Sequence, residues 1–298
     1  RLLKVIENLK NHGAANVIMS RTATLPMIAG AHDPRYIDRV VALAPQEGIA
    51  ALDEDTKMSP GSLNAALAAA GTACHAVDLV LDGKARNVFC AVRPPGHHAF
   101  YDKSMGFCIF NNVAVAAAHA MNARGLKRVA IVDFDVHHGN GTQDILQRKL
   151  TNTCFASLQE ARLWPYNDND QVTSGNIMNI GIERGAPAAS WHNHMEQKVI
   201  PFLRRYNPEL LIISAGFDAH RNDPPEGILF NDPPGKQNLL DEDYARMTRA
   251  LAGLADECCG GRVVSCMEGG YNTNVLAGAA TAHVRALTGA QQAKADAA

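Results

Sequence analysis

Aromatic residues and charge are both scarce in this sequence. Phe, Trp and Tyr make up 6% of its 298 residues, and Asp, Glu, Lys and Arg together make up 19%. The formal net charge is only −2, so the composition indicates no basic surface for phosphates, and we expect no direct nucleic-acid binding. We find no apolar run long enough to span a bilayer and no secretory leader, so we expect no membrane association.

Paired cysteines are lacking as well. The seven cysteines form no CxxC motif and are odd in number, and most of them lie in apolar stretches. Buried free thiols are the ordinary interpretation of this pattern, which favours a reducing cytoplasm over a disulfide-bonded secreted protein.

Apolar residues, which make up 47% of the chain, are sufficient for a sizeable core. They fall in short runs that alternate with helical patterns. The runs predict strands over 87–93, 128–134, 153–158, 209–215 and 262–267, and the patterns between them predict helices over 59–83, 111–124 and 188–205. Ser59 is expected to cap the first of these helices, with Pro60 in its first turn.

Strands separated by helix-length connections are typical of right-handed crossovers. We therefore expect an α/β fold with a single parallel β-sheet flanked by helices on both faces. No repeat, linker or composition shift marks a second domain, so we expect one domain over 1–298. Because the sequence begins at Arg1 rather than at Met, we also expect that an N-terminal segment is missing.

Residues suited to chemistry gather where the predicted strands end. Four strands are followed at once by such segments, namely RPPGHH at 93–98, DFDVHHGNG at 133–141, SAGFDAH at 214–220 and EGGYN at 268–272. In an open parallel sheet, ligands bind beyond the carboxyl ends of the strands. We therefore expect these segments, which are far apart in the sequence, to meet at one edge of the sheet.

A metal site is predicted at this edge. Asp135 and His137 are two residues apart at a strand end, so both side chains can point to the same side. With Asp218 they supply three ligands and leave a position open for water, as in catalytic zinc sites. An isolated Asp-x-His pair more often caps a loop, and the third carboxylate at another strand end is what favours a metal.

Two further groups suit catalysis beside such a metal. His97 and His98 follow a rigid Pro-Pro-Gly turn and can present a general base to water, although adjacent loop histidines are often only exposed polar residues. Asp133 can orient one imidazole, make a buried structural hydrogen bond or bind an alkali cation. Tyr271 follows two glycines and can either donate to an oxyanion or pack at a turn.

These segments resemble the zinc-dependent histone deacetylase family, in particular its class II branch and the bacterial histone deacetylase-like amidohydrolases and acetylpolyamine amidohydrolases. GFCIFNN at 106–112 and the longer VDFDVHHGNGTQ at 132–143 add to the resemblance, which covers nearly the whole chain in the family's order. It implies the arginase/deacetylase fold and one histone deacetylase-like catalytic domain. It also implies a zinc-dependent hydrolase that removes acetyl or other acyl groups from lysine side chains or related amines.

The resemblance also assigns residues to roles. The zinc ligands would be Asp135, His137 and Asp218. His98 would be the general base and acid, and His97, hydrogen-bonded to Asp133, would be its electrostatic partner. Tyr271 would polarise the acyl carbonyl. A potassium ion near the zinc would be bound by Asp133, Asp135, His137, Ser157 and Leu158, partly through main-chain oxygens.

Substrate-binding residues follow from the same resemblance. Phe107, next to Gly106, matches one wall of an acyl-lysine tunnel, and Trp164 stands where the opposite wall would be; core packing is the alternative for both. Asp55 falls near the rim position that binds the substrate backbone, where an exposed loop carboxylate would look the same. Gly270 is assigned to substrate binding as well.

The sequence departs from the family pattern at four places. Asn140 stands where class I members have a second carboxylate beside the general base, so we expect a less basic His98. Gln159 replaces a histidine, 164–170 lacks the FPGTG-like segment, and 222–235 is longer than in a minimal member. The missing FPGTG-like segment is the departure that bears most on whether Trp164 forms the opposite wall of the tunnel.

Two other classes of protein share this fold. Arginase-like enzymes hold two metals, whereas Gly139, Asn140 and the lone Asp218 leave only one full ligand set here. A catalytically inert binding module would have lost a ligand or Tyr271, and all are present. His192 and His194 we expect at the surface of a helix.

The natural substrate stays open at this stage. Asp53, Glu54 and Asp55 form an acidic cluster that would favour cationic substrates mainly through the encounter rate, although runs of charge usually only solvate a loop. An acylated lysine peptide and an acetylated polyamine both fit. A homo-oligomer is compatible with the sequence, and a His/carboxylate site can also take iron or cobalt in place of zinc.

Overall fold

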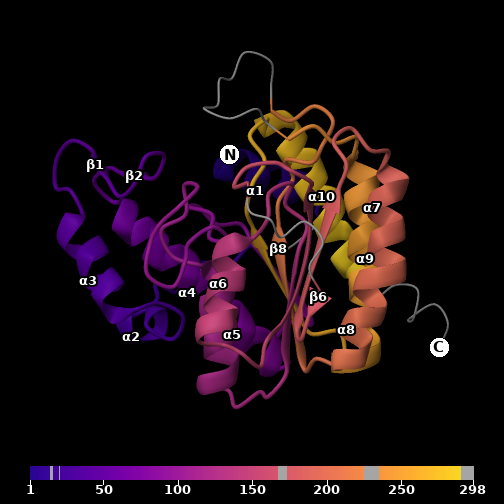
Figure 1. Cartoon of the computed structure of the whole chain (residues 1–298), viewed down its shortest axis with the longest axis horizontal. Coiled ribbons are helices and arrows are strands. Elements are labelled where there is room, and N and C mark those ends of the chain that lie inside the picture. The colour runs from indigo at the N-terminus through magenta and orange to yellow at the C-terminus, as the bar shows by residue number, and fades with distance from the viewer. Residues whose placement is uncertain (14–15, 20, 167–172, 225–234, 290–298) are drawn as a thin grey trace.

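The computed structural model describes residues 1–13, 16–19, 21–166, 173–224 and 235–289. Within them, seven strands form one sheet in the order β3-β9-β8-β4-β5-β7-β6 (Figure 1). The strands are β3 (Asn87–Cys90), β4 (Val129–Asp133), β5 (Cys154–Glu160), β6 (Thr173–Ser174), β7 (Ile177–Ile182), β8 (Leu210–Ala215) and β9 (Val263–Met267). All neighbours are parallel except β6, which pairs antiparallel with β7.

Helices cover both faces of the sheet, as the sequence predicted. One face carries α4 (Ser62–Leu81), α5 (Asn112–Asn122) and α6 (Asn140–Arg148) (Figure 1). The other carries α1 (Leu2–Asn11), α7 (Ala188–His194), a π-helical turn (Met195–Val199), α8 (Ile200–Tyr206), α9 (Asp241–Cys259) and α10 (Thr273–Gly289). Next to α4 lie the short elements α2 (Leu25–Ile28), α3 (Pro34–Leu43), β1 (Ala50–Ala51) and β2 (Lys57–Met58).

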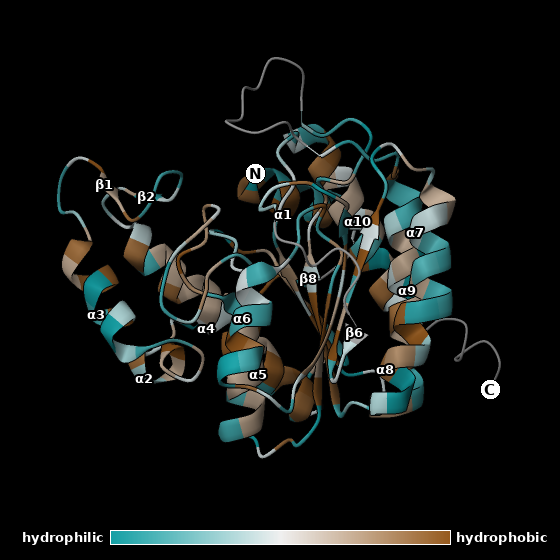
Figure 2. Ribbon diagram, in the orientation of Figure 1, coloured by the Kyte–Doolittle hydropathy of each residue, from teal (hydrophilic) through white to brown (hydrophobic). Residues whose placement is uncertain are grey.

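Successive side chains of each strand point to opposite faces of the sheet, so a hydrophobic core lies on each face. In β4, Ile131 packs into the core under α4 and α5, while Val132 packs into the core under α9 and α10. A strand buried on both sides must be apolar at every position, and this is why β4 reads as a continuous hydrophobic run. Hydrophobic residues accordingly concentrate on the strands and on the helix surfaces turned toward them (Figure 2).

The five predicted strands are confirmed within a few residues, but β7 was missed. Its sequence contains Asn179 and Gly181, which have low strand propensity, and it follows a polar loop. Pairing along its whole length with β5 makes it a strand nonetheless. Tertiary pairing here overrides a weak local signal.

Helix α4 differs from its prediction in two ways. It begins at Ser62 after Gly61, rather than next to Ser59. The Ser59 side chain was expected to cap the helix, but instead the Ser59 backbone N–H donates to the Ser62 side chain at Oγ, at 2.9 Å. Contrary to the sequence prediction, α4 is also long and apolar enough to cross a membrane by length and composition. Half of that stretch is buried inside the protein, where α4 packs against α5 as a core helix does.

The predicted helix over 188–205 is present, interrupted by one π-helical turn. Its inner side holds Trp191, which is fully buried and donates from Nε1 to Gln237 Oε1 at 3.1 Å. His192, predicted at the surface, is in fact buried, and its Nε2 lies 3.1 Å from Asp243 Oδ1. The prediction was wrong because the helix packs against both the sheet and α9, so its buried side is broader than a single stripe.

We expect Trp191→Ala to lower the free energy of unfolding by about 3–5 kcal/mol, since it removes a large buried side chain and leaves a cavity. Urea denaturation measures this change. The control is Asn193→Ala, an exposed position in the same helix, where we expect a change within about 0.5 kcal/mol. Equal stability of the two variants would contradict the packing described for α7.

Candidate active site

Parallel pairing brings the predicted site segments to one edge of the sheet. Asp133 ends β4 and lies opposite Ser157 of β5 and Ser214 of β8 in the strand register. Ser214 in turn lies opposite Cys266 of β9, so the carboxyl ends of these strands are level. The segments that follow them therefore meet, as the sequence predicted.

Asp135, His137 and Asp218 form a cluster at this edge whose candidate ligand atoms lie within 4.8 Å of one another. His137 Nδ1 is 3.0 Å from Asp135 Oδ1 and 3.3 Å from Asp218 Oδ2. Both carboxylates are buried, and backbone N–H groups orient them: Gly269 donates to Asp135 and Val136 donates to Asp218. Three side chains from two loops thus converge on one point.

The cluster fits a divalent metal ion. Among the described residues, Asp218 Oδ2 has no hydrogen-bond partner although it is buried, and two buried carboxylates this close are costly without a compensating cation. A Cβ on Gly269 would lie 2.5 Å from Asp135 Oδ2 and still closer to Asp218 Oδ2, so only glycine leaves the carboxylates room. Two oxygens and one imidazole nitrogen suit zinc.

The pKa shifts within the cluster also indicate that it attracts positive charge. Burial by itself lowers the pKa of His137, but the adjacent carboxylates of Asp135 and Asp218 outweigh burial and raise that pKa to about 10. Burial and the charge of Asp135 raise the pKa of Asp218. A divalent cation bound to these atoms would supply the positive charge that the carboxylates otherwise draw from a proton.

His97 and His98 lie beside the cluster with their ring centroids 3.9 Å apart. His97 Nδ1 donates to Asp133 Oδ2 at 2.9 Å, and His98 Nδ1 lies 2.8 Å from Asn140 Oδ1. The Gly141 N–H also donates to that amide oxygen, which identifies it as the acceptor. His98 must therefore carry its proton on Nδ1, and its Nε2 keeps a free lone pair.

The two histidines have opposite pKa shifts. Burial by itself lowers the pKa of His97, but the carboxylates of Asp135 and Asp133 raise it well above its ordinary value. Burial, with the charges of His97 and His137, holds the pKa of His98 well below its ordinary value. Burial and the neighbouring charges thus place one strongly basic imidazole, His97, beside one poorly basic imidazole, His98.

Glu268 was quoted within a motif but given no role, and the structure shows it to be central. Its buried carboxylate accepts from the Gly96 N–H at 2.6 Å, from the His97 N–H at 3.2 Å and from Ser214 Oγ at 3.1 Å. Burial raises its pKa to about 7. A carboxylate at the end of an apolar strand is the signal that sequence reasoning could have used.

Aromatic rings line the space in front of the histidines. The Trp164 ring centroid is 4.7 Å from that of His98, and the Phe107 centroid is 6.3 Å from that of Tyr271. Gly106, which precedes Phe107, has φ +58, and a Cβ there would be 2.5 Å from His98 Cδ2 and 2.7 Å from Trp164 Cη2. Trp164 therefore contacts the site histidines; the segment that follows it, 167–172, lies outside the described residues.

The loop of Asp53 and Asp55 supports one of these walls. Asp55 Oδ1 accepts from the Gly106 N–H at 3.1 Å, and Thr56 Oγ1 accepts from the Phe107 N–H at 3.1 Å. Asp53 accepts from the N–H groups of Asp55 and Thr56 and from the Ser104 hydroxyl. Two of the three expected rim carboxylates are thus tied into the loop, and Glu54 is the exposed one.

Three more predicted site residues lie near this edge. Gly270 has φ +112 and lies against Phe217 and Leu276. Ser157 and Leu158, assigned to potassium by resemblance, are fully buried in β5 next to Asp133 of β4. Within the described ranges, Ser157 Oγ has no hydrogen-bond partner.

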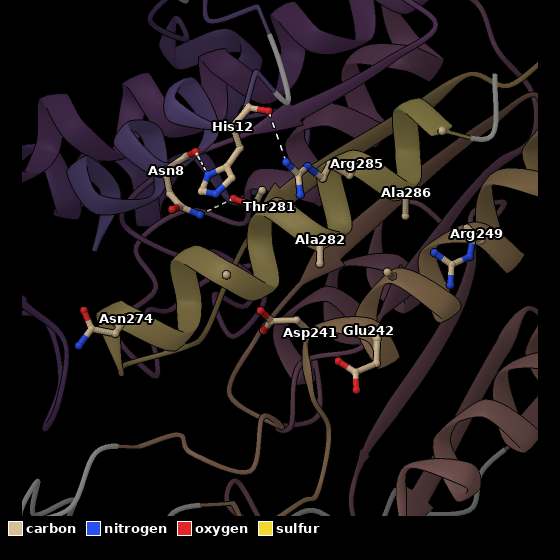
Figure 3. A pocket seen from close by; sticks show the side chains of 13 residues that line it. Asn8, His12, Asp241, Glu242, Arg249, Asn274, Thr281, Ala282, Arg285 and Ala286 are labelled. Atoms are coloured by element: carbon tan, nitrogen blue, oxygen red, sulfur yellow. Dashed lines mark hydrogen bonds between the residues drawn. The ribbon is translucent and has the colours of Figure 1, made fainter. Parts of the chain in front are cut away.

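A groove of about 720 Å³ lies away from these residues, between α1, α9 and α10 (Figure 3). Asp241 and Glu242 lie on one helix, Arg285 lies on another, and the backbone oxygen of His12 accepts from Arg285 (Figure 3). None of the predicted site residues lines this groove. It therefore has no part in the candidate active site.

The family model "Histone deacetylase domain" matches residues 1–287. The chain belongs to the histone deacetylase family. It is 40% identical over 78% of its length to Type-2 histone deacetylase 2 of Dictyostelium discoideum, 34% identical over 89% to the histone deacetylase-like amidohydrolase of Pseudomonas aeruginosa, and 32% identical over 97% to human polyamine deacetylase HDAC10. It spans 14%, 68% and 44% of those proteins.

A solved structure agrees with the family assignment. The crystal structure of the HDA15 HD domain matches this family member with a TM-score of 0.86 and 33% identity, covering 97% of the chain and 80% of that domain. The predicted arginase/deacetylase fold and the predicted family are therefore both confirmed. The names of the relatives agree with the predicted class of hydrolytic deacetylases and amidohydrolases.

We expect Asp135→Ala, His137→Ala and Asp218→Ala to lose both metal and activity while keeping most of the fold, because each removes one of three ligands. Elemental analysis gives zinc per chain, and circular dichroism checks the fold. Glu257→Ala, a carboxylate removed on the surface of α9, is the control and should keep its zinc. Full zinc occupancy in two of the three variants would refute the ligand set.

Proposed function

We propose that the protein is a zinc-dependent amidohydrolase that removes acetyl or other acyl groups from lysine side chains or related amines. The observation that carries this proposal is the pairing of the Asp135–His137–Asp218 cluster with His98, whose tautomer leaves Nε2 as a proton acceptor. A metal site without an adjacent base would suit a structural ion equally well. With the base present, hydrolysis is the reaction the arrangement fits best.

When bound by this cluster, zinc lowers the pKa of a water molecule and polarises the acyl oxygen. His98 stays neutral at physiological pH because its pKa is low, so Nε2 accepts the proton of the attacking water. The water oxygen then bonds to the acyl carbon, the C–N bond breaks, and His98 passes its proton to the amine nitrogen. His97, held by Asp133, keeps positive charge next to this transfer.

Tyr271 supplies the second stabilising group. Burial and the carboxylates of Asp218 and Asp135 raise the pKa of Tyr271, so its hydroxyl remains protonated and can donate to the acyl oxygen as negative charge develops there. Phe107, near Tyr271, and Trp164, near His98, would hold an extended, uncharged acyl-amine stem between them.

We expect His98→Ala and Tyr271→Phe to keep the metal but to lose roughly 10²-fold or more in kcat, the usual scale for a general base or an oxyanion donor. Steady-state kinetics on a good acetyl-lysine or acetylpolyamine substrate, with zinc content measured in parallel, checks both parts. Turnover near the wild-type rate in either variant would remove that residue from the mechanism.

Acylated lysine in peptides is the substrate that we rank first, and acetylated polyamines are the second candidate. The name of the Dictyostelium relative supports the first, and the name of the human relative supports the second. Comparing kcat/KM for acetyl-lysine peptides and acetylated polyamines separates the two. A strong preference for the polyamines would reverse our ranking.

A potassium ion near the zinc is also part of the proposal. The buried Ser157 Oγ, which lacks a partner within the described ranges, supports it, because oxygen ligands suit a hard cation. We propose further that the chain acts as one domain in the cytoplasm, where its seven free cysteines stay reduced, without direct nucleic-acid or membrane binding. A homo-oligomer is compatible with this function.

We expect the preference for cationic over neutral acyl-amines to fall with added salt and in Asp55→Asn, because the carboxylates of the 53–55 loop attract cations at the rim. Asparagine can still accept from the Gly106 N–H, so the change removes charge more than structure. The measurement is kcat/KM for matched substrates at low and high ionic strength, with Glu257→Gln as control. An unchanged ratio under both treatments would exclude the loop from substrate selection.

A further inference from the structure

Asp223 lies outside the cluster that we assign to the metal, yet it binds the backbone on both sides of the Tyr271 side chain. Its Oδ2 accepts from the Tyr271 N–H and from the Asn272 N–H, each at 2.6 Å. The side chain is buried, with 6% of its surface exposed. Hydrogen bonds of this length to a carboxylate are charge-assisted and about twice as strong as neutral ones.

We propose that Asp223 is a positioning residue that holds the Tyr271 loop in the geometry needed for hydrolysis. The inference rests on the proposed function, since it concerns how the Tyr271 hydroxyl is aimed. Asp223 touches only the backbone of residues 271 and 272 in these two contacts, and so would act on the reaction through Tyr271.

The tyrosine loop needs an external anchor. Tyr271 follows Gly269 and Gly270, and Gly270 has φ +112, a conformation that side-chain-bearing residues rarely adopt. Glycines leave a backbone with many accessible conformations. The N–H groups at 271 and 272 also precede α10, where backbone donors have no partner within the helix. The buried carboxylate of Asp223 both restrains this backbone and accepts from these two N–H groups.

Asp223 also connects the tyrosine to the metal cluster. It follows Asp218 by five residues, and its own N–H donates to His220 O at 2.9 Å, which closes the turn between them. Two more bonds join the same pair of loops: Asn272 Nδ2 donates to Asn222 O at 2.9 Å, and the Phe217 N–H donates to Gly269 O at 3.1 Å. The position of Tyr271 is therefore set relative to a metal ligand.

Small displacements matter at such a site. A donor moved by about 1 Å can cost on the order of 10²-fold in rate, since the hydroxyl must reach the acyl oxygen as charge develops. Asp223 makes both contacts through Oδ2, while Oδ1 accepts no hydrogen bond from the part of the chain that the structure describes. An asparagine, which keeps one acceptor oxygen, should therefore preserve the anchor, and an alanine should not.

The test is a double-mutant cycle between positions 223 and 271. We expect Asp223→Ala to lower kcat about 10- to 100-fold with KM and zinc content nearly unchanged, and Asp223→Asn to recover most of that loss. In the Tyr271→Phe background, where no hydroxyl remains to be aimed, Asp223→Ala should cost less than about 3-fold more. Asp223→Ser provides the same comparison if the alanine variant does not fold.

The outcomes separate this inference from the proposed function. Losses in kcat that multiply in the double variant would show a general structural role for Asp223 and overturn the inference, as would wild-type kcat in Asp223→Ala while Tyr271→Phe is impaired. A Tyr271→Phe variant with wild-type kcat would instead overturn the role proposed for the tyrosine. Loss of zinc in Asp223→Ala and Asp223→Ser alike would assign Asp223 to the metal loop and overturn the inference.

Discussion

Two carboxylates, Asp135 and Asp218, are buried within a few ångströms of each other at the edge of the sheet. The structure around them must compensate the free-energy cost of burying two negative charges so close together. Backbone N–H groups donate to both oxygens of Asp135 and to one oxygen of Asp218, and the His137 ring lies close to both carboxylates. A bound cation would offset the remaining negative charge. Because strand ends supply these side chains, their spacing is held by the sheet itself.

Neighbouring groups of the same kind acquire different chemistry here through what surrounds them. His97 and His98 are adjacent in sequence and close in space, but their pKa values move in opposite directions. Nearby carboxylates outweigh burial at His97 and raise its pKa, whereas burial and the positive charges of His97 and His137 lower the pKa of His98. Two further buried carboxylates act as backbone anchors: Glu268 binds the histidine loop and Asp223 binds the tyrosine loop. These two acids thereby fix the backbone that carries His97 and Tyr271.

Much of this could be predicted from the sequence, and the failures have physical causes. Strands such as β4 are apolar at every position because both faces are buried, which makes them visible without a structure. Strand β7 was missed because Asn179 and Gly181 weaken its local signal. His192 was wrongly predicted to be exposed, because a helix that packs against two partners buries more than one stripe of side chains. Asp223 went unnoticed since it resembles an ordinary loop acid.

By itself, the sequence determined the parallel α/β fold, the family, and the segments that meet at the sheet edge. Parallel strands have their carboxyl ends at the same edge of a sheet, and those segments follow strands directly. Only the tertiary structure decided which atoms meet. The tautomer of His98 depends on an amide oxygen 42 residues away, and the anchoring of Tyr271 depends on a carboxylate 48 residues away. Such contacts are set by packing between elements, and local residue patterns carry no record of them.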